Sequence, residues 1–251
     1  MEELVSVVMP LHNAELYLYS SIQSVLSQTY RNWELLIVDD CSSDGSPEII
    51  KEYYRQDERI KIFKTEKPSG SPTLPRNLGT EKAKGRYITF LDSDDLWLPT
   101  KLEHQLKTMN EHPEALLIYS NYRKMDTTGK PHRSVVTAPP MTNYRKLLNG
   151  NVIGCLTALY DTKKTGKLYF PYCGHEDYVL WLSVLRNGGI AVNTNTEEAQ
   201  YRLSDSSVSS NKFRAMRWQW HIYNKVEGLN LLESVYYFAN YAIRALNKRR
   251  K

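Results

Sequence analysis

Three carboxylates stand together where a short apolar stretch ends. Residues 87–91 have the aromatic and β-branched character of a buried strand, and Asp92, Asp94 and Asp95 follow them directly. Carboxylates this close repel one another, and a hard divalent cation relieves the repulsion because it prefers oxygen ligands. In open α/β sheets the ligand crevice lies outside the carboxyl ends of the strands. The stretch therefore predicts a metal and phosphate site, with a solvated acidic turn as the alternative.

A second acidic pair follows another apolar strand. Asp39 and Asp40 come directly after a strand predicted at residues 34–38. The carboxyl ends of parallel strands lie at the same edge of a sheet. We therefore expect this pair to lie close to the acidic residues that follow the strand at 87–91.

Strands and helices alternate through about the first hundred residues. Apolar runs predict the strands, and apolar residues at helical spacing predict the helices between them. The predicted strands are 5–9, 34–38, 60–63 and 87–91, and the predicted helices are 15–28, one capped by Ser46, and 76–84. The alternation predicts an α/β fold with a Rossmann-like, mostly parallel central sheet flanked by helices. Farther along, we expect a strand at 115–119 and an irregular polar loop at 126–140.

The overall composition is that of a globular protein. The 251 residues are 41% apolar and 24% charged, with a modest net charge of +5. Cys41, Cys155 and Cys173 are widely spaced and odd in number, which argues against a disulfide framework and against a zinc site. No apolar run reaches the roughly 18–20 residues of a membrane-spanning helix, and the N-terminus is unlike a signal peptide. These features favour a cytoplasmic protein, and we expect no nucleic-acid partner.

A further titratable cluster opens a predicted helix. His175, Glu176 and Asp177 stand before an apolar helical face that Gly188 and Gly189 end. Carboxylates at a helix N-terminus gain from the helix dipole. The cluster therefore has either a capping or a catalytic role.

Two aromatic-rich helices are predicted at residues 211–226 and 229–246. The second carries an apolar stripe at helical spacing, made of Leu232, Val235, Tyr236, Ala239, Ile243 and Leu246. Basic residues are interleaved, and the sequence ends in four of them. This mixture suits a peripheral membrane contact through residues 211–251. Packing against the rest of the chain, or against a second subunit in a homodimer, is the alternative.

Five segments, taken together and in order, resemble one family of enzymes. They are VSVVMPLHNAELYL, LLIVDDCSSDGS, PRNLG, GRYITFLDSDDLW and GHEDYVLWL. The pattern resembles the inverting, metal-dependent glycosyltransferases of family 2, which have the GT-A fold. The resemblance covers roughly residues 4–210. It implies a GT-A catalytic domain at residues 1–210 and a C-terminal helical extension at residues 211–251.

The resemblance implies a site for a sugar carried on a nucleoside diphosphate, most often UDP. In the family the loop after the first strand passes the nucleobase, which assigns Pro10 and Leu11 to this contact. The first carboxylate after the second strand accepts a hydrogen bond from uracil, which assigns Asp39. Arg76, in the segment PRNLG, would lie near the base or the phosphates, and a surface position on its helix is the alternative.

The acidic segment resembles the D-x-D motif of the family, with Asp92, Ser93 and Asp94 in its three places. Asp92 would face the ribose or the metal, and Asp94 would ligate Mn²⁺ or Mg²⁺. Asp95 would do either, or cap the following helix. Such a cation bridges the two phosphates and stabilises the departing diphosphate, so no protein acid is needed to protonate the leaving group.

The resemblance also assigns the remaining chemistry. Asp177 would be the general base for the acceptor hydroxyl, with Glu176 beside it, and direct attack would invert the anomeric carbon. His175 would contact the donor sugar or the metal, with helix capping as the alternative. The residues expected to close over the diphosphate are Arg202 and the serines of residues 206–210, Ser209 among them.

The resemblance implies a hexosyltransferase of surface polysaccharide synthesis. Such an enzyme would move a sugar from a UDP-sugar to a hydroxyl of a glycan or lipid-linked acceptor, at the inner face of the cell membrane. The pattern is similar to bacterial enzymes that build teichuronic acids and capsules. A dinucleotide-binding oxidoreductase would need G-x-G-x-x-G after the first strand, where PLHNAE stands. A catalytically inactive nucleotide-sugar or glycan-binding relative of the same fold is the open alternative.

Overall fold

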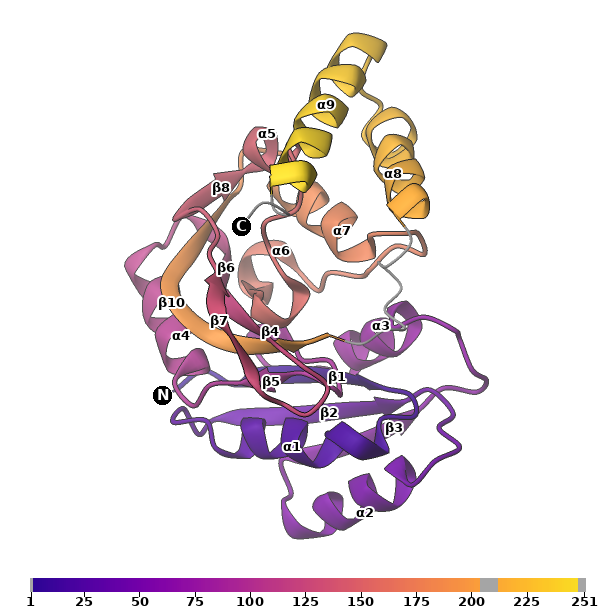
Figure 1. Ribbon diagram of the computed structural model, residues 1–251. Helices are drawn as coiled ribbons and strands as arrows, with labels where there is room; N and C mark the ends of the chain where they lie inside the picture. Colours follow the sequence, from indigo (N-terminus) through magenta and orange to yellow (C-terminus); the bar gives the residue numbers. More distant parts are fainter. Residues whose placement is uncertain (1, 204–211, 248–251) are drawn as a thin grey trace.

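The computed structural model describes residues 2–203 and 212–247, and within them ten strands form one sheet (Figure 1). The first part of the sheet is parallel, in the order β3-β2-β1-β4. These strands are β1 (Val5–Leu11), β2 (Trp33–Asp39), β3 (Ile60–Lys64) and β4 (Tyr87–Phe90). All four coincide with apolar runs of the sequence, so the predicted α/β architecture is confirmed.

The second part of the sheet mixes strand directions. β9 (Leu159–Asp161) lies antiparallel between β4 and β6 (Ala115–Met125), and β10 (Ile190–Arg202) runs parallel to β6. Three short strands pair with the two long ones: β5 (Leu96–Trp97) and β8 (Met141–Asn143) with β10, and β7 (Pro131–Val136) with β6. β9 therefore joins the parallel half to the long strands.

Helices cover both faces of the sheet (Figure 1). On one face lie α1 (Glu15–Leu26), α2 (Ser46–Gln56) and α4 (Lys101–Glu111). On the other face lie α3 (Thr73–Lys82), α5 (Tyr144–Leu147) and α7 (Glu176–Leu185). The short 3-10 helix η1 (Cys155–Thr157) and α6 (Thr162–Thr165) flank β9.

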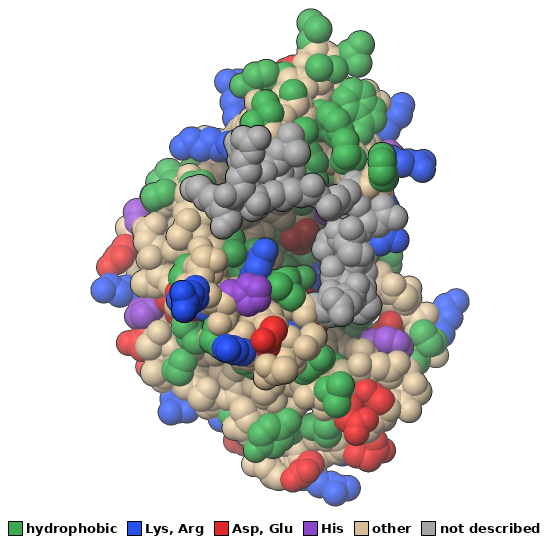
Figure 2. Space-filling model, in the orientation of Figure 1, with side chains coloured by type: hydrophobic (Ala, Val, Ile, Leu, Met, Phe, Trp, Pro, Cys, Tyr) green, Lys and Arg blue, Asp and Glu red, His purple; other side chains and the backbone are tan. Residues whose placement is uncertain are grey.

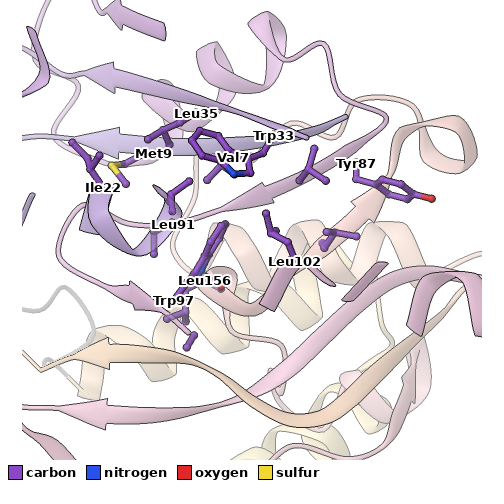
Figure 3. Packing of buried hydrophobic residues seen from close by; sticks show 14 of the residues in the cluster. Val7, Met9, Ile22, Trp33, Leu35, Tyr87, Leu91, Trp97, Leu102 and Leu156 are labelled. Carbon is purple, nitrogen blue, oxygen red and sulfur yellow. Dashed lines mark hydrogen bonds between the residues drawn. The ribbon is translucent and has the colours of Figure 1, made fainter. Parts of the chain in front are cut away.

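Strand alternation divides the core between the two faces. In β1, Val7 and Met9 belong to the cluster that packs with α1, α2 and α4, part of which Figure 3 shows. Val8, between them, belongs to the cluster that packs with α5 and α7. All three side chains are fully buried. Because both faces of these strands are covered, the strands are continuous apolar runs rather than alternating ones.

The predicted strand at 5–9 ends before Pro10, but β1 continues through Pro10. The strand continues to Leu11, and Pro10 stands in register with Val38 of β2. On its other side, β1 pairs with β4 only as far as Val8. Proline cannot donate to a strand ladder, so it is tolerated where the strand has lost one neighbour.

Among the described residues, five strands lie where the sequence pattern predicts none, and β7 and β10 are the longest of them. The expected loop at 126–140 contains β7, and β10 follows the helix that ends near Gly188. The pairing of β10 with β6 shifts register between Asn193 and Glu197, and Asn195 has a φ of 61°. Such bulges break the two-residue alternation by which a strand is recognised.

The C-terminal helices project from the body of the molecule (Figure 1). They are α8 (Lys212–His221), the π-helical turn η3 (Ile222–Val226) and α9 (Leu231–Asn247). Tyr223 anchors them, because its ring is buried in the cluster of α7 and its hydroxyl donates to the carbonyl of Leu148 at 2.6 Å. The boundary at residue 210 stays a prediction. In the described part of the chain, no helix has the length and apolar character needed to span a bilayer.

Gly79 of α3 allows the helix to lie close against β1. A Cβ atom at this position would stand 2.5 Å from Cγ1 of Val8. At an exposed helix position, replacing Gly with Ala stabilises a protein by about 1 kcal/mol. Here we expect Gly79→Ala to lower the free energy of unfolding by about 1–3 kcal/mol, because overpacking pushes the helix away from the sheet. Urea unfolding measures the change.

The control for this prediction makes room for the added methyl group. The double variant Gly79→Ala/Val8→Ala should lose less free energy of unfolding than the sum of the losses of the two single variants. A Gly79→Ala protein that is as stable as the parent would contradict the close packing.

Candidate active site

A cavity of about 340 Å³ opens at the carboxyl ends of β1, β2 and β4. Five residues that the sequence assigns to nucleotide or metal binding line it together: Pro10, Leu11, Asp92, Ser93 and Asp94. The cavity is also lined by Asp40, by the segment from Gly70 to Pro72 before α3, and by His12 and Pro75. The predicted convergence of the two acidic segments is therefore realised here, at the edge where open α/β sheets bind ligands.

The carboxylates after β4 differ in their surroundings. Asp94 lies at the cavity, and burial, followed by the charge of Asp92, raises its pKa to about 6. Asp95 is fully buried, and its Oδ1 accepts a hydrogen bond from the backbone N–H of Arg202 at 2.8 Å. Burial raises the pKa of Asp95 well above its usual range. Asp95 does not cap α4, because β5 separates it from the helix start at Lys101.

Arg76 joins two acidic segments of the site. Its Nη2 donates to both carboxylate oxygens of Asp92, at 2.7 and 2.9 Å, and its Nη1 donates to Oε1 of Glu176 at 2.9 Å. The guanidinium is buried on α3 and lies 5.3 Å from the ring centroid of Phe170. Burial opposes its charge, but the carboxylate of Asp92 raises the pKa of Arg76 above its usual range. The alternative of a surface position is therefore wrong, and Arg76 ties α3, the acidic loop and α7 together.

Asp177 stands in the first turn of α7. Its Oδ2 accepts a hydrogen bond from Nδ2 of Asn151 at 3.0 Å, and its Oδ1 accepts one from the backbone N–H of Tyr178 at 2.7 Å. Burial, followed by the charge of Glu176, raises the pKa of Asp177 to about 6. A carboxylate with a raised pKa is a better proton acceptor at neutral pH. Asn151, which orients it, carries no sequence signal because it lies outside any motif.

His175 precedes α7 in the left-handed conformation, with a φ of 58°. Its side chain makes no capping hydrogen bond to the helix, so the capping alternative is not realised. The ring instead meets Trp218 of α8 edge-on, with 5.4 Å between centroids. Gly174 permits this approach, because a Cβ there would come within 2.0 Å of the Trp218 ring. A contact of His175 with the donor sugar or the metal stays a prediction.

The two carboxylates after β2 have different partners. Asp39 is buried, and its Oδ1 accepts a hydrogen bond from the N–H of Ser42 at 2.8 Å. Asp40 lines the cavity and accepts hydrogen bonds from the hydroxyl of Thr65 and from the N–H and hydroxyl of Ser69. Burial is outweighed by these hydrogen bonds, which lower the pKa of Asp40. Asp40, to which the sequence assigns no role of its own, thus holds the loop that forms one wall of the cavity.

Arg202, at the end of β10, is buried and bound to backbone. Its Nε donates to the carbonyl of Asp94 at 2.7 Å, and its Nη1 donates to the carbonyls of Asp126 and Thr127, both at 3.2 Å. The guanidinium also lies 4.3 Å from the ring centroid of Tyr17. Arg202 therefore positions the acidic loop, and its predicted contact with the diphosphate stays a prediction. The serines of 206–210, including Ser209, lie outside the described residues.

The oxygen atoms of the acidic loop suit a divalent cation. The charge of Asp92 crowds Asp94, and Oδ2 of the buried Asp95 has no hydrogen-bond partner. Within residues 2–203 and 212–247, no three His, Cys, Asp or Glu side chains converge as a complete protein cage would require. Mg²⁺ is usually held by one or two carboxylates together with substrate phosphates and water. Asp92 and Asp94 fit that mode of binding.

Comparison with solved structures identifies the fold. The structure of S. aureus TarS 1-349 in complex with UDP matches 97% of this chain and 72% of its own, with a TM-score of 0.71 and 21% identity. The mannosyltransferase PcManGT from Pyrobaculum calidifontis, in complex with GDP-Man and Mn²⁺, matches 96% of this chain and 71% of its own, with a TM-score of 0.71 and 16% identity. The fold is the GT-A fold of glycosyltransferases.

Comparison of sequences defines the family. Residues 6–160 match the family described as Glycosyl transferase family 2. The chain is 41% identical to the UDP-Glc:alpha-D-GlcNAc-diphosphoundecaprenol beta-1,3-glucosyltransferase WfgD of Escherichia coli, across 98% of this chain and 94% of that protein. It is 40% identical to the putative teichuronic acid biosynthesis glycosyltransferase TuaG of Bacillus subtilis strain 168, across 98% and 97%. The chain belongs to glycosyltransferase family 2.

The ion pairs of Arg76 should matter for stability. We expect Arg76→Gln to lower the free energy of unfolding by about 3 kcal/mol, because it leaves Asp92 and Glu176 without their partner. Arg59→Gln is the control, since it removes a more exposed bidentate pair with Asp57 and should cost about 1 kcal/mol or less. Denaturant unfolding compares the two variants. Equal losses would show that Arg76 does not hold the site together.

Proposed function

We propose that this glycosyltransferase moves a sugar from a UDP-sugar to a hydroxyl of a lipid-linked glycan, with a divalent cation and with inversion of the anomeric carbon. The observation that carries the proposal is the arrangement around Arg76. One guanidinium binds both Asp92, which lines the cavity together with Asp94, and Glu176, which directly precedes Asp177. Carboxylates suited to a metal and a carboxylate suited to accept a proton thus belong to one connected site.

The relatives support the donor and the acceptor. WfgD is named for glucose transfer from UDP-Glc to alpha-D-GlcNAc-diphosphoundecaprenol, and TuaG for teichuronic acid biosynthesis. Both match nearly the whole chain, which supports a UDP-sugar donor, a lipid-linked acceptor and a place in surface polysaccharide synthesis. The direct test is incubation with a panel of UDP-sugars, Mn²⁺ and a diphosphate-linked GlcNAc acceptor, with the product analysed by mass spectrometry. No transfer from any UDP-sugar would overturn the proposal.

The residues of the chain divide the chemistry between them. Asp92 and Asp94 would hold Mn²⁺ or Mg²⁺, which when bound offsets the charge of the departing diphosphate. Asp177 accepts the proton of the acceptor hydroxyl, while Asn151 holds its carboxylate in place. The ion pair with Arg76 keeps Glu176 beside the base. The acceptor oxygen attacks the anomeric carbon from the face opposite the diphosphate, and a single displacement inverts its configuration.

The metal assignment predicts a change in nucleotide binding that needs no turnover. In the presence of Mn²⁺, Asp94→Asn should weaken UDP binding by about ten- to a hundredfold, because a charged contact contributes about 1.5–3 kcal/mol. Calorimetry measures the affinity, and Glu48→Gln, an exposed acid on α2, is the control. EDTA should lower the UDP affinity of the parent protein to that of the Asp94→Asn variant. Equal UDP affinity of the parent with and without metal would refute the assignment.

The nucleobase assignment separates Asp39 from Asp40. Oδ1 of Asp39 accepts the hydrogen bond from Ser42, and Oδ2 lies 4.0 Å from Nζ of Lys64. We assign Oδ2 as the acceptor of the ring N–H of uracil. Asp39→Asn should weaken UDP binding by about 1.5–3 kcal/mol, measured by calorimetry. The matched variant Asp40→Asn should lower stability instead, because it loosens the loop at Ser69. A normal UDP affinity of Asp39→Asn would exclude this role.

The base assignment predicts a pH dependence. At saturating metal and donor, the turnover of the parent should fall as the pH drops below about 6, because Asp177 becomes protonated. Asp177→Asn should keep UDP and metal binding and lower kcat by about 10²- to 10⁴-fold. The residual turnover of Asp177→Asn should no longer fall as the pH drops below about 6.

Glu176→Gln serves as the comparison for the base. It should lower kcat less than Asp177→Asn, and its effect should appear more in substrate binding. Two results would count against the assignment: a near-normal kcat of Asp177→Asn, or a product that retains the anomeric configuration of the donor.

A further inference from the structure

Helix α9 turns an apolar row away from the protein. The row, which we name the α9 stripe, consists of Leu232, Val235, Tyr236 and Ile243, each more than half exposed. These positions share one helical face. The opposite face packs inward: Ser234 is fully buried, Tyr237 meets the ring of Tyr223, and Phe238 meets the ring of Trp220. One face of α9 is therefore docked through its aromatic rings, while the apolar row on the opposite face is uncovered.

Helix α8 extends the same kind of surface. Phe213 and Met216 are exposed on it. Figure 2 shows hydrophobic side chains gathered over the projecting end of the molecule, with Lys and Arg side chains to either side. Singly exposed apolar residues are ordinary on protein surfaces, whereas a row of them on neighbouring helices marks an interaction site.

The charge of the sequence is concentrated in the same part. Residues 211–251 contain nine Lys and Arg and two Asp and Glu, a formal charge of +7, whereas the whole chain carries +5. The first 210 residues therefore carry a formal charge of −2. A segment that is both basic and amphipathic is attracted to anionic lipid headgroups and buries its apolar face at their boundary with the acyl chains.

We propose that the α9 stripe, together with α8, binds the surface of a membrane that contains anionic lipid. A second copy of the chain fits this surface poorly, because a two-fold contact through the stripe would bring two segments of charge +7 together. The inference extends the proposed function and rests on it for its purpose, since a lipid-linked acceptor lies at such a surface. The binding itself requires no donor, acceptor or turnover.

Vesicle flotation of the full chain tests the proposal. The parent should float with vesicles of phosphatidylcholine and phosphatidylglycerol, float less with pure phosphatidylcholine, and be released in part by salt. Leu232→Ser/Tyr236→Ser removes side chains that are 84% and 61% exposed. Leu16→Ser/Tyr19→Ser on α1 is the matched control, because its side chains are 85% and 63% exposed. The stripe variant should bind at least about tenfold more weakly, and the control should bind like the parent.

The outcomes separate this inference from the proposed function. UDP binding with Mn²⁺, measured without vesicles, should be unchanged in both double variants. If the parent does not bind UDP, that result counts against the proposed function and not against the membrane inference. The inference is overturned if the parent does not float with phosphatidylglycerol vesicles, or if the stripe variant floats like the parent. It is also overturned if sedimentation shows a dimer that only the stripe variant dissociates. If the double variant does not fold, Ile243→Ser tests the same face.

Discussion

The candidate site depends on the ion pairs of one buried guanidinium. Arg76 binds Asp92 and Glu176, which stand 16 and 100 residues away along the chain. Without the guanidinium of Arg76 between them, the carboxylates of the acidic loop and of the start of α7 would stand close together in a partly buried place. Such crowding is unfavourable because burial weakens solvent screening. The pairs let carboxylates gather at one sheet edge while keeping α3, β4 and α7 in fixed positions.

A second arginine holds the acidic loop from its other side. Arg202 binds the carbonyl of Asp94 through its side chain and Oδ1 of Asp95 through its backbone N–H. The loop is thus fixed by the side-chain contact of Arg76 with Asp92 and by the contacts of the last residue of β10. Burial in this loop and at the start of α7 raises the pKa values of Asp94 and Asp177, each to about 6. The same packing that orders these carboxylates therefore makes both sensitive to protons in a similar range.

The C-terminal helices connect to this site through one turn. Trp218 of α8 lies against Gly174 and His175, directly before the carboxylates of α7. Tyr223 of η3 fixes the other end of the same unit by its hydrogen bond to Leu148. The helices that carry the exposed stripe are therefore anchored to the segment that presents the proposed base. If the proposed membrane contact holds, this anchoring would link the orientation of the molecule at the membrane with the position of the candidate site.

The sequence by itself determined the parallel α/β core, the acidic loop and the carboxylates that open α7. Each of these is a local pattern: an apolar run, a cluster of like charges, or a helix start. Only the tertiary structure decided that Arg76 bridges two segments, that Arg202 turns inward, that Asn151 orients Asp177, and that β10 is a strand. It also decided which face of α9 is uncovered, since an amphipathic pattern shows that a helix has an apolar side but not what lies against it. These features arise from contacts between residues far apart in the chain, and such contacts leave no signature in any short stretch of it.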